Sequence, residues 1–258
     1  MRTHFFLAPA RTLFLRGSAA FALALSGCGG GSAENGSALT NNAAPIPQIA
    51  APNNGDWTET VSATERGGYL MGNPNAPVKL IEYGSISCPV CARFSVEGFQ
   101  PLTTRYVRSG QVSWEFRPFL IHAQDPGVFL LLHCLGPQPF FRVAEQLYAT
   151  QQDWVGRSVA MPPEQAQQLQ NMDPHGQAAA MVRVMGLDQF FRQRGLPEAR
   201  MNACLADDAA LQQLGEISRR ATSEENVQGT PTFIVNGEKL DSSDWASLEP
   251  RLRSAIGG

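Results

Sequence analysis

The chain has 258 residues, of which 43% are hydrophobic and 17% are charged, and its formal net charge is −3. This is enough apolar sequence for an ordinary folded core, and the length suggests one large domain or two small ones. The slight excess of acidic residues argues against a nucleic-acid-binding protein, which needs a basic face.

The N-terminus has the layout of a bacterial secretory signal. Residues 1–16 carry three arginines and no acid, and residues 17–27 form a short apolar run that ends in small residues. That run is too short for a membrane-spanning helix, which needs about 20 apolar residues. We therefore predict a signal peptide over residues 1–27.

The segment Leu25-Ser26-Gly27-Cys28 closes this leader. It resembles the lipobox of bacterial lipoproteins, and the resemblance implies a lipid on Cys28. The alternative is an ordinary signal that is cleaved nearby, with Cys28 as a bystander thiol. Residues 29–56 are rich in Gly, Ser, Ala, Asn and Pro, so residues 28–56 are predicted to be a lipidated cysteine followed by a flexible linker.

A strand-to-helix junction carries the most informative motif. Residues 78–83 favour a strand, and Cys88-Pro89-Val90-Cys91 follows, with a helical pattern behind it. Pro89 suits the first helical position. Since a helix N-terminus favours negative charge, we expect a lowered pKa for Cys88, the attacking sulfur, and a resolving role for Cys91. A metal site or a structural disulfide is the alternative, but zinc would need two more matched ligands.

A second motif lies more than a hundred residues downstream. Residues 228–237 read as a turn, the sequence Thr230-Pro231, a strand, and a tight Asn236-Gly237 turn. Together with the strand and the C-x-x-C helix, this pattern resembles a thioredoxin fold. The resemblance implies a cis Thr230–Pro231 bond beside the C-x-x-C, with a loop backbone that holds an extended client strand.

Most of residues 68–256 resemble the DsbA-like branch of that superfamily. The shared features include residues 72–78 and Glu82, six positions before Cys88. The resemblance implies that Glu82 is a buried acid that helps proton transfer with Cys91; the alternative is a surface charge at a strand edge. The predicted fold class is α/β, a thioredoxin fold with an inserted all-helical domain. Its expected boundaries are 57–125 for the first thioredoxin part, 126–206 for the insert and 207–258 for the second part.

Two residues depart from DsbA itself. Val90 stands where DsbA has a histidine, so the resemblance implies a less depressed Cys88 pKa and a less oxidising pair. Thr230 replaces the valine that is usual in DsbA. The direction of electron flow therefore stays open between an oxidase and an isomerase or reductase.

The predicted insert shows helical periodicity, with an apolar face over residues 140–148 and a helix that starts at Asp173-Pro174 and ends at Gly186. As in some DsbA-like relatives, Cys134 and Cys204 are expected to form a structural disulfide; a second redox pair is the alternative. The remaining candidates for chemistry are three histidines without an obvious partner, expected to serve at the surface or in packing: His122, His133 and His175.

The sequence thus predicts a thiol–disulfide oxidoreductase, most simply a dithiol oxidase that introduces disulfides into exported proteins with free thiols. The resemblance implies that its electrons pass to a DsbB-like membrane quinone reductase. No cofactor, metal or nucleic acid is expected, and the expected location is the periplasmic side of a bacterial envelope, on a lipid anchor. The alternative to an enzyme is a chaperone module that binds peptides beside Pro231.

Overall fold

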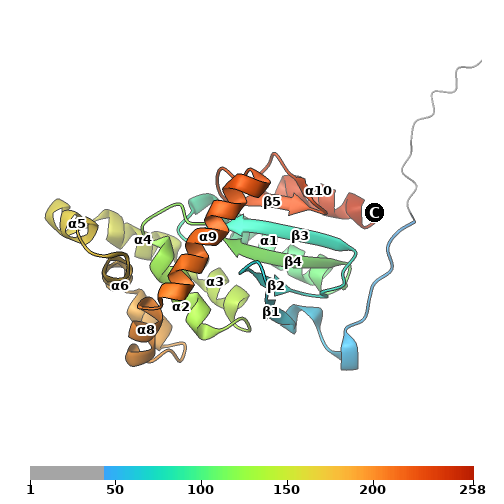
Figure 1. Ribbon diagram of the computed structural model, residues 1–258. Coiled ribbons are helices and arrows are strands. Elements are labelled where there is room, and N and C mark those ends of the chain that lie inside the picture. The colour runs from blue at the N-terminus through green and yellow to red at the C-terminus, as the bar shows by residue number, and fades with distance from the viewer. Residues whose placement is uncertain (1–43) are drawn as a thin grey trace, which may run out of the picture. The chain divides into compact units, whose positions relative to one another are not determined.

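The computed structural model describes residues 44–258, so the predicted signal peptide and Cys28 lie outside the described residues. A six-stranded sheet in the order β1-β2-β4-β3-β5-β6 forms the framework (Figure 1). The central strands β3 and β4 run parallel, and the other neighbours are antiparallel. The strands are β1 (Val61–Ala63), β2 (Tyr69–Met71), β3 (Val78–Gly84), β4 (Val112–Pro118), β5 (Thr232–Val235) and β6 (Glu238–Lys239).

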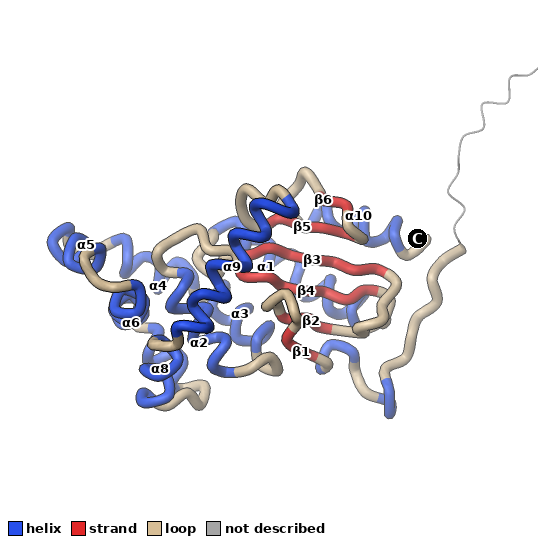
Figure 2. The backbone as a smooth tube through the Cα atoms, viewed as in Figure 1, coloured by secondary structure: helices blue, strands red, loops and turns tan. Residues whose placement is uncertain are grey.

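Helices α1 and α10 lie behind the sheet in Figure 1, and α9 crosses in front of it. The other helices lie between β4 and α9 in the sequence and gather at one end of the sheet, on the left of Figure 2. The helices are α1 (Pro89–Pro101), α2 (Asp125–Leu135), α3 (Phe140–Ala149), α4 (Gln151–Val159), α5 (Pro163–Gln170), α6 (Pro174–Met185), α7 (Leu187–Arg192), α8 (Glu198–Leu205), α9 (Asp208–Glu225) and α10 (Trp245–Ala255). Two short 3₁₀ helices are η1 (Pro52–Asn54) and η2 (Trp57–Glu59), and η3 (Leu102–Val107) is a π-helical segment that follows α1.

Local sequence signals explain several element ends. Asp173 caps α6 by accepting hydrogen bonds from two backbone amides of its first turn, and Gly186 ends the helix in the left-handed conformation. Asn236 and Gly237 both have positive φ angles, as a tight hairpin turn requires, and they join β5 to β6. These sequence predictions are confirmed.

Aromatic side chains lock α1 onto the sheet. The ring of Phe94 lies 4.6 Å from that of Phe233 on β5 and 6.5 Å from that of Trp114 on β4. All three side chains are buried. Because α1 begins at the C-x-x-C, this packing fixes the position of the motif at the carboxyl end of β3.

Residues 44–56 were predicted to be part of a flexible linker, but the structure attaches them to the domain. The Ile46 amide donates to the carbonyl of Ile256, the Ile49 amide donates to that of Ser109, and Trp57 Nε1 donates to the carbonyl of Ile49 at 2.7 Å. Ile46 also packs against the core. Composition suggested a tether, but the Ile46 side chain and the backbone hydrogen bonds of Ile46 and Ile49 attach this segment to the domain.

No helix within residues 44–258 combines the length and the apolar character needed to cross a membrane.

Candidate active site

The two cysteines of the C-x-x-C lie at the start of α1, just after the end of β3. Cys88 precedes the helix as its N-cap residue, Pro89 is the first helical residue, and Cys91 follows in the first turn. Both cysteines are free thiols, and the exposed fraction is 4% for Cys88 and zero for Cys91. An incoming sulfur would therefore meet Cys88 before Cys91.

The electrostatics of the two thiols differ strongly. The Cys91 thiol donates toward Cys88 and lowers the pKa of Cys88 to about 5, against the opposing effect of burial; Thr230 and the amides of Val90 and Cys91 assist. Burial, followed by the neighbouring Cys88, raises the pKa of Cys91 well above its usual value. At neutral pH the pair is thus a thiolate beside a thiol.

The loop before β5 lies against this pair. The Thr230–Pro231 peptide bond is cis, and the Cys88 thiol contacts the Thr230 carbonyl oxygen at 3.3 Å. The Thr230 hydroxyl is buried and has no hydrogen-bond partner within the described chain. A buried hydroxyl without a partner is costly, so this group is available to donate to a Cys88 thiolate.

Glu82 lies inside the sheet, beneath the cysteines. Its side chain is buried, and burial raises its pKa to about 8, although Trp114 Nε1 donates to Oε2 at 3.1 Å. Glu82 also contributes to the raised pKa of Cys91, which indicates that the two groups are close. A cavity of about 10 Å³ adjoins Glu82, Ser95 and Glu145, enough for about one water molecule.

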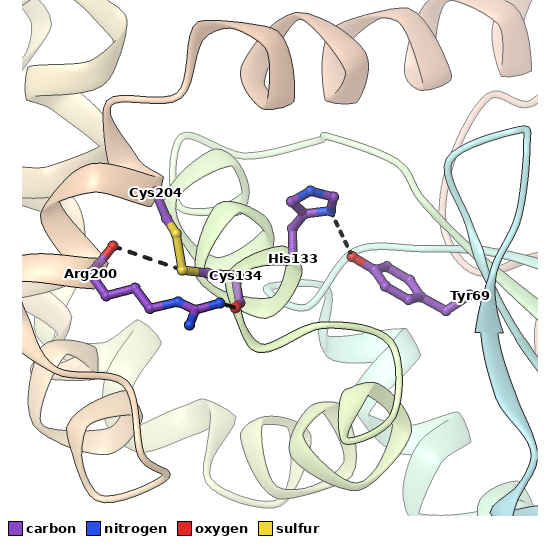
Figure 3. Close-up of a disulfide and its surroundings, with 5 residues drawn as sticks. All are labelled: Tyr69, His133, Cys134, Arg200 and Cys204. Atoms are coloured by element: carbon purple, nitrogen blue, oxygen red, sulfur yellow. Dashed lines mark hydrogen bonds between the residues drawn. A yellow bond between two sulfur atoms is a disulfide. The ribbon is translucent and has the colours of Figure 1, made fainter.

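The structure thus brings together Cys88, Cys91, Thr230, Pro231 and Glu82, the residues that the sequence analysis assigned to the redox site. The other predicted pair, Cys134 and Cys204, forms a disulfide between α2 and α8 (Figure 3). Within residues 44–258 no group of three or more His, Cys, Asp or Glu side chains is arranged to hold a metal ion.

Sequence reasoning missed the side chains that hold the loop before Cys88. Gln151 on α4 donates to the carbonyls of Ile86 and Cys88 at 2.7 and 2.9 Å, and the Tyr148 hydroxyl on α3 donates to the carbonyl of Ser85 at 3.2 Å. An amide or a phenol in a helical pattern gives no signal of such a role, because the partner is created by the fold.

Of the three histidines within residues 44–258, one lies near the site and two lie away from it. His122 Nδ1 lies 2.7 Å from the hydroxyl of Ser87, and Ser87 directly precedes Cys88 in the chain. His133 on α2 faces the Tyr69 hydroxyl at 3.4 Å (Figure 3), and His175 on α6 contacts Asp208 at 2.8 Å. The expectation of a purely surface or packing role is therefore incomplete for His122.

Comparison with known families agrees with this geometry. A family model described as Thioredoxin matches residues 64–253. The chain belongs to the thioredoxin family. The predicted fold class, a thioredoxin fold with added helices, is confirmed by this match and by solved structures of similar architecture.

Two solved structures illustrate the likeness. The protein-disulfide isomerase of Novosphingobium aromaticivorans is 29% identical, with a TM-score of 0.71 over 73% of this chain and 97% of that one. The alpha-DsbA1 of Wolbachia pipientis is 17% identical, with a TM-score of 0.61 over 76% of this chain and 94% of that one, and at this identity it supports the fold alone.

Curated sequences include a provisionally named protein-disulfide oxidoreductase of Rickettsia bellii (strain RML369-C). It is 23% identical over 188 residues, which cover 72% of this chain and 64% of the relative. The match thus spans less than two thirds of that relative's length. The Bacillus subtilis (strain 168) protein named disulfide bond formation protein D is 26% identical over 98 residues, covering 35% of this chain and 44% of the relative.

Proposed function

We propose that this chain is a thiol–disulfide oxidoreductase that oxidises pairs of thiols in exported proteins. The observation that carries the proposal is the unequal pair: a Cys88 pKa near 5 beside a Cys91 pKa well above its usual value. Exchange needs one sulfur that is accessible and a good leaving group, and a second that resolves the mixed disulfide.

The same inequality favours oxidation. Stabilising the Cys88 thiolate stabilises the reduced pair, so the Cys88–Cys91 disulfide becomes the stronger oxidant. A client thiolate attacks Cys88 and expels Cys91, and Glu82 then supplies or accepts the proton that Cys91 exchanges. The client's second thiol releases Cys88, and two electrons stay on the enzyme.

Isomerase or reductase activity is the second candidate. The name of the Novosphingobium aromaticivorans structure, a protein-disulfide isomerase, favours it. An enzyme working in this direction would be kept reduced, with Cys88 ready to attack a client disulfide. A DsbB-like quinone reductase would be the partner of the oxidase only.

We place the protein on the periplasmic face of a bacterial envelope, held by a lipid on Cys28. The predicted secretory leader and the Cys134–Cys204 disulfide, which suits an oxidising compartment, support this location. Metabolic labelling with a radioactive fatty acid tests the anchor, and a label that persists on Cys28→Ala would contradict it.

The activity is tested with the oxidised full-length chain and a peptide that carries two thiols. We expect stoichiometric peptide oxidation, its loss in Cys88→Ala, and a trapped mixed disulfide in Cys91→Ala. A chain that is inert in both oxidation and insulin reduction would instead fit a peptide-binding module. The redox state of the pair in acid-quenched cells then separates an oxidase, which rests oxidised, from an isomerase or reductase, which rests reduced.

A further inference from the structure

A buried hydrogen-bond chain lies directly behind the attacking cysteine. Asp125, the first residue of α2, is completely buried. Its Oδ1 accepts from the hydroxyls of Ser85 and Ser87, both at 2.8 Å, and from the Ser87 amide at 3.3 Å. Its Oδ2 accepts from the amides of Ile121 and His122 at 2.9 and 3.0 Å. Five donors thus converge on one carboxylate.

This arrangement assigns the proton positions along the chain. A carboxylate can only accept, so the single Ser87 hydroxyl proton points to Asp125. The Ser87 oxygen must then accept from His122 Nδ1, which lies 2.7 Å away. His122 therefore carries a proton on Nδ1, and in a neutral imidazole of this tautomer the free lone pair is on Nε2. The side chain is exposed, and Nε2 has no hydrogen-bond partner among residues 44–258.

Topology brings His122 to the edge of the sheet where Cys88 lies. Strands β3 and β4 are parallel, so the segments that follow them emerge at the same end. The Phe119 amide, just after β4, donates to the carbonyl of Gly84, the last residue of β3. Further along, the Ser87 hydroxyl on the first segment contacts His122 Nδ1 on the second at 2.7 Å.

We propose that His122 is the general base that deprotonates the client thiol, with Ser87 and Asp125 as its positioning residues. This inference rests on the proposed function. The client S–H proton passes to Nε2, the client sulfur bonds to Cys88 Sγ, and the Cys88–Cys91 bond breaks with its electron pair on Cys91. In the reverse direction, His122 returns the proton to the departing client sulfur.

The step matters because a free cysteine, with a pKa of about 8.5, is mainly protonated at neutral pH. The thiolate is the nucleophile, so a base beside the disulfide raises the fraction of productive encounters. Within the hydrogen-bond chain Asp125 is the charged group, and it contacts the Ser87 hydroxyl and the His122 amide. Ser85 and Ser87 are neutral. The Asp125 carboxylate orients the imidazole and favours the cation that forms after proton transfer.

The test is stopped-flow oxidation of a synthetic two-thiol peptide by the oxidised full-length chain between pH 6 and pH 10. His122→Asn keeps an amide donor for Ser87 but has no basic nitrogen. We expect its second-order rate to fall about tenfold or more near pH 6.5, and to approach the wild-type rate near pH 10, where the peptide thiol ionises unaided. Ser87→Ala should show a smaller loss with the same pH dependence.

His175→Asn is the matched control, because that histidine bonds to Asp208 and the Leu205 carbonyl, away from the site. Its rates should equal those of the wild type. The redox equilibrium with glutathione should be unchanged in His122→Asn, since a base alters the rate and not the equilibrium.

A wild-type rate in His122→Asn at every pH, or an equal loss at every pH, would overturn the inference and leave the proposed function intact. A wild-type chain that never oxidises the peptide would overturn both. Thermal unfolding of each variant identifies a folding defect, and added imidazole should restore part of the rate in His122→Ala only if a base is missing.

Discussion

Single side chains around Cys88 set the reactivity of the pair. The two pKa values differ because Cys91 and backbone amides donate to Cys88, with the unpartnered Thr230 hydroxyl available as a further donor, whereas Cys91 lies in the apolar core. DsbA has a histidine directly before its second cysteine, and this chain has Val90 at that position. The absence of the histidine does not prevent a Cys88 pKa near 5, because hydrogen bonds supply the stabilisation instead.

The Thr230 hydroxyl offers a direct test of this account. Thr230→Val removes a donor to the thiolate, so we expect the Cys88 pKa to rise from about 5 by roughly one unit, the order of one hydrogen bond to a charged group. Titration of thiolate absorbance at 240 nm measures it. Thr232→Val is the control, because the Thr232 hydroxyl bonds to the Gly229 carbonyl. A midpoint equal to the wild-type value would contradict a role for Thr230.

Because the pKa of buried Glu82 is raised, we expect the free energy of unfolding to depend on pH. The pKa of Glu82 is about 8 in the folded chain against 4.5 for a glutamate in water, so unfolding releases a proton between these pH values. The free energy of unfolding of the reduced protein should fall as pH rises through this window. In Glu82→Gln that contribution should vanish, so the variant gains stability over the wild type from pH 4.5 to pH 8. Urea unfolding at both ends measures the gain, and a constant difference would argue against it.

Between elements, a disulfide joins two of the added helices, and hydrogen bonds join two of them to the loop before Cys88. The disulfide links α2 to α8 across 70 residues of sequence. Asp125 at the start of α2 and Gln151 at the start of α4 reach the loop before Cys88. The added helices therefore form part of the wall of the redox site.

Removal of the disulfide should separate stability from chemistry. Cys134→Ala with Cys204→Ala should lower the free energy of unfolding by about 4 kcal/mol, the upper-end figure for closing a loop of this length. Denaturant unfolding measures the loss. Peptide oxidation by Cys88 and Cys91 should persist below the unfolding transition. Loss of peptide oxidation in the folded double variant would instead indicate that Cys134 and Cys204 are a second redox pair.

At the scale of the described chain, residues 44–56, which precede the sheet, form part of the domain. Residues 44–56 cross its surface and bond to Ser109 and to Ile256 near the C-terminus. The stretch that composition marked as a linker up to residue 56 is therefore attached to the domain at Ile46 and Ile49.

Hydrogen exchange tests this attachment. The amides of Ile46 and Ile49 should be protected in the full-length chain. Trp57→Phe removes the bond to the Ile49 carbonyl, worth roughly 1 kcal/mol, and should speed exchange at both amides about fivefold. The amide of Trp114, in the central strand β4, is the control. Unprotected exchange throughout residues 44–56 in the wild type would restore the view of a flexible linker.

The sequence by itself determined what short-range chemistry can encode. The strand followed by the C-x-x-C, the proline at the first helical position, the Asn236-Gly237 turn and the Asp173 cap each depend on neighbouring residues, and the structure bears them out. The association of Thr230-Pro231 with Cys88 came from resemblance, because no local rule joins segments so far apart.

Only the tertiary structure decided which side chains meet. His122, Asp125 and Gln151 have ordinary sequence contexts, yet folding brings them to Ser87 and to the backbone of Cys88. Burial, which raises the pKa of Glu82 and of Cys91, is likewise a property of the packed chain. Long-range hydrogen bonds and desolvation depend on distances in space, and spacing along a single sequence does not specify them.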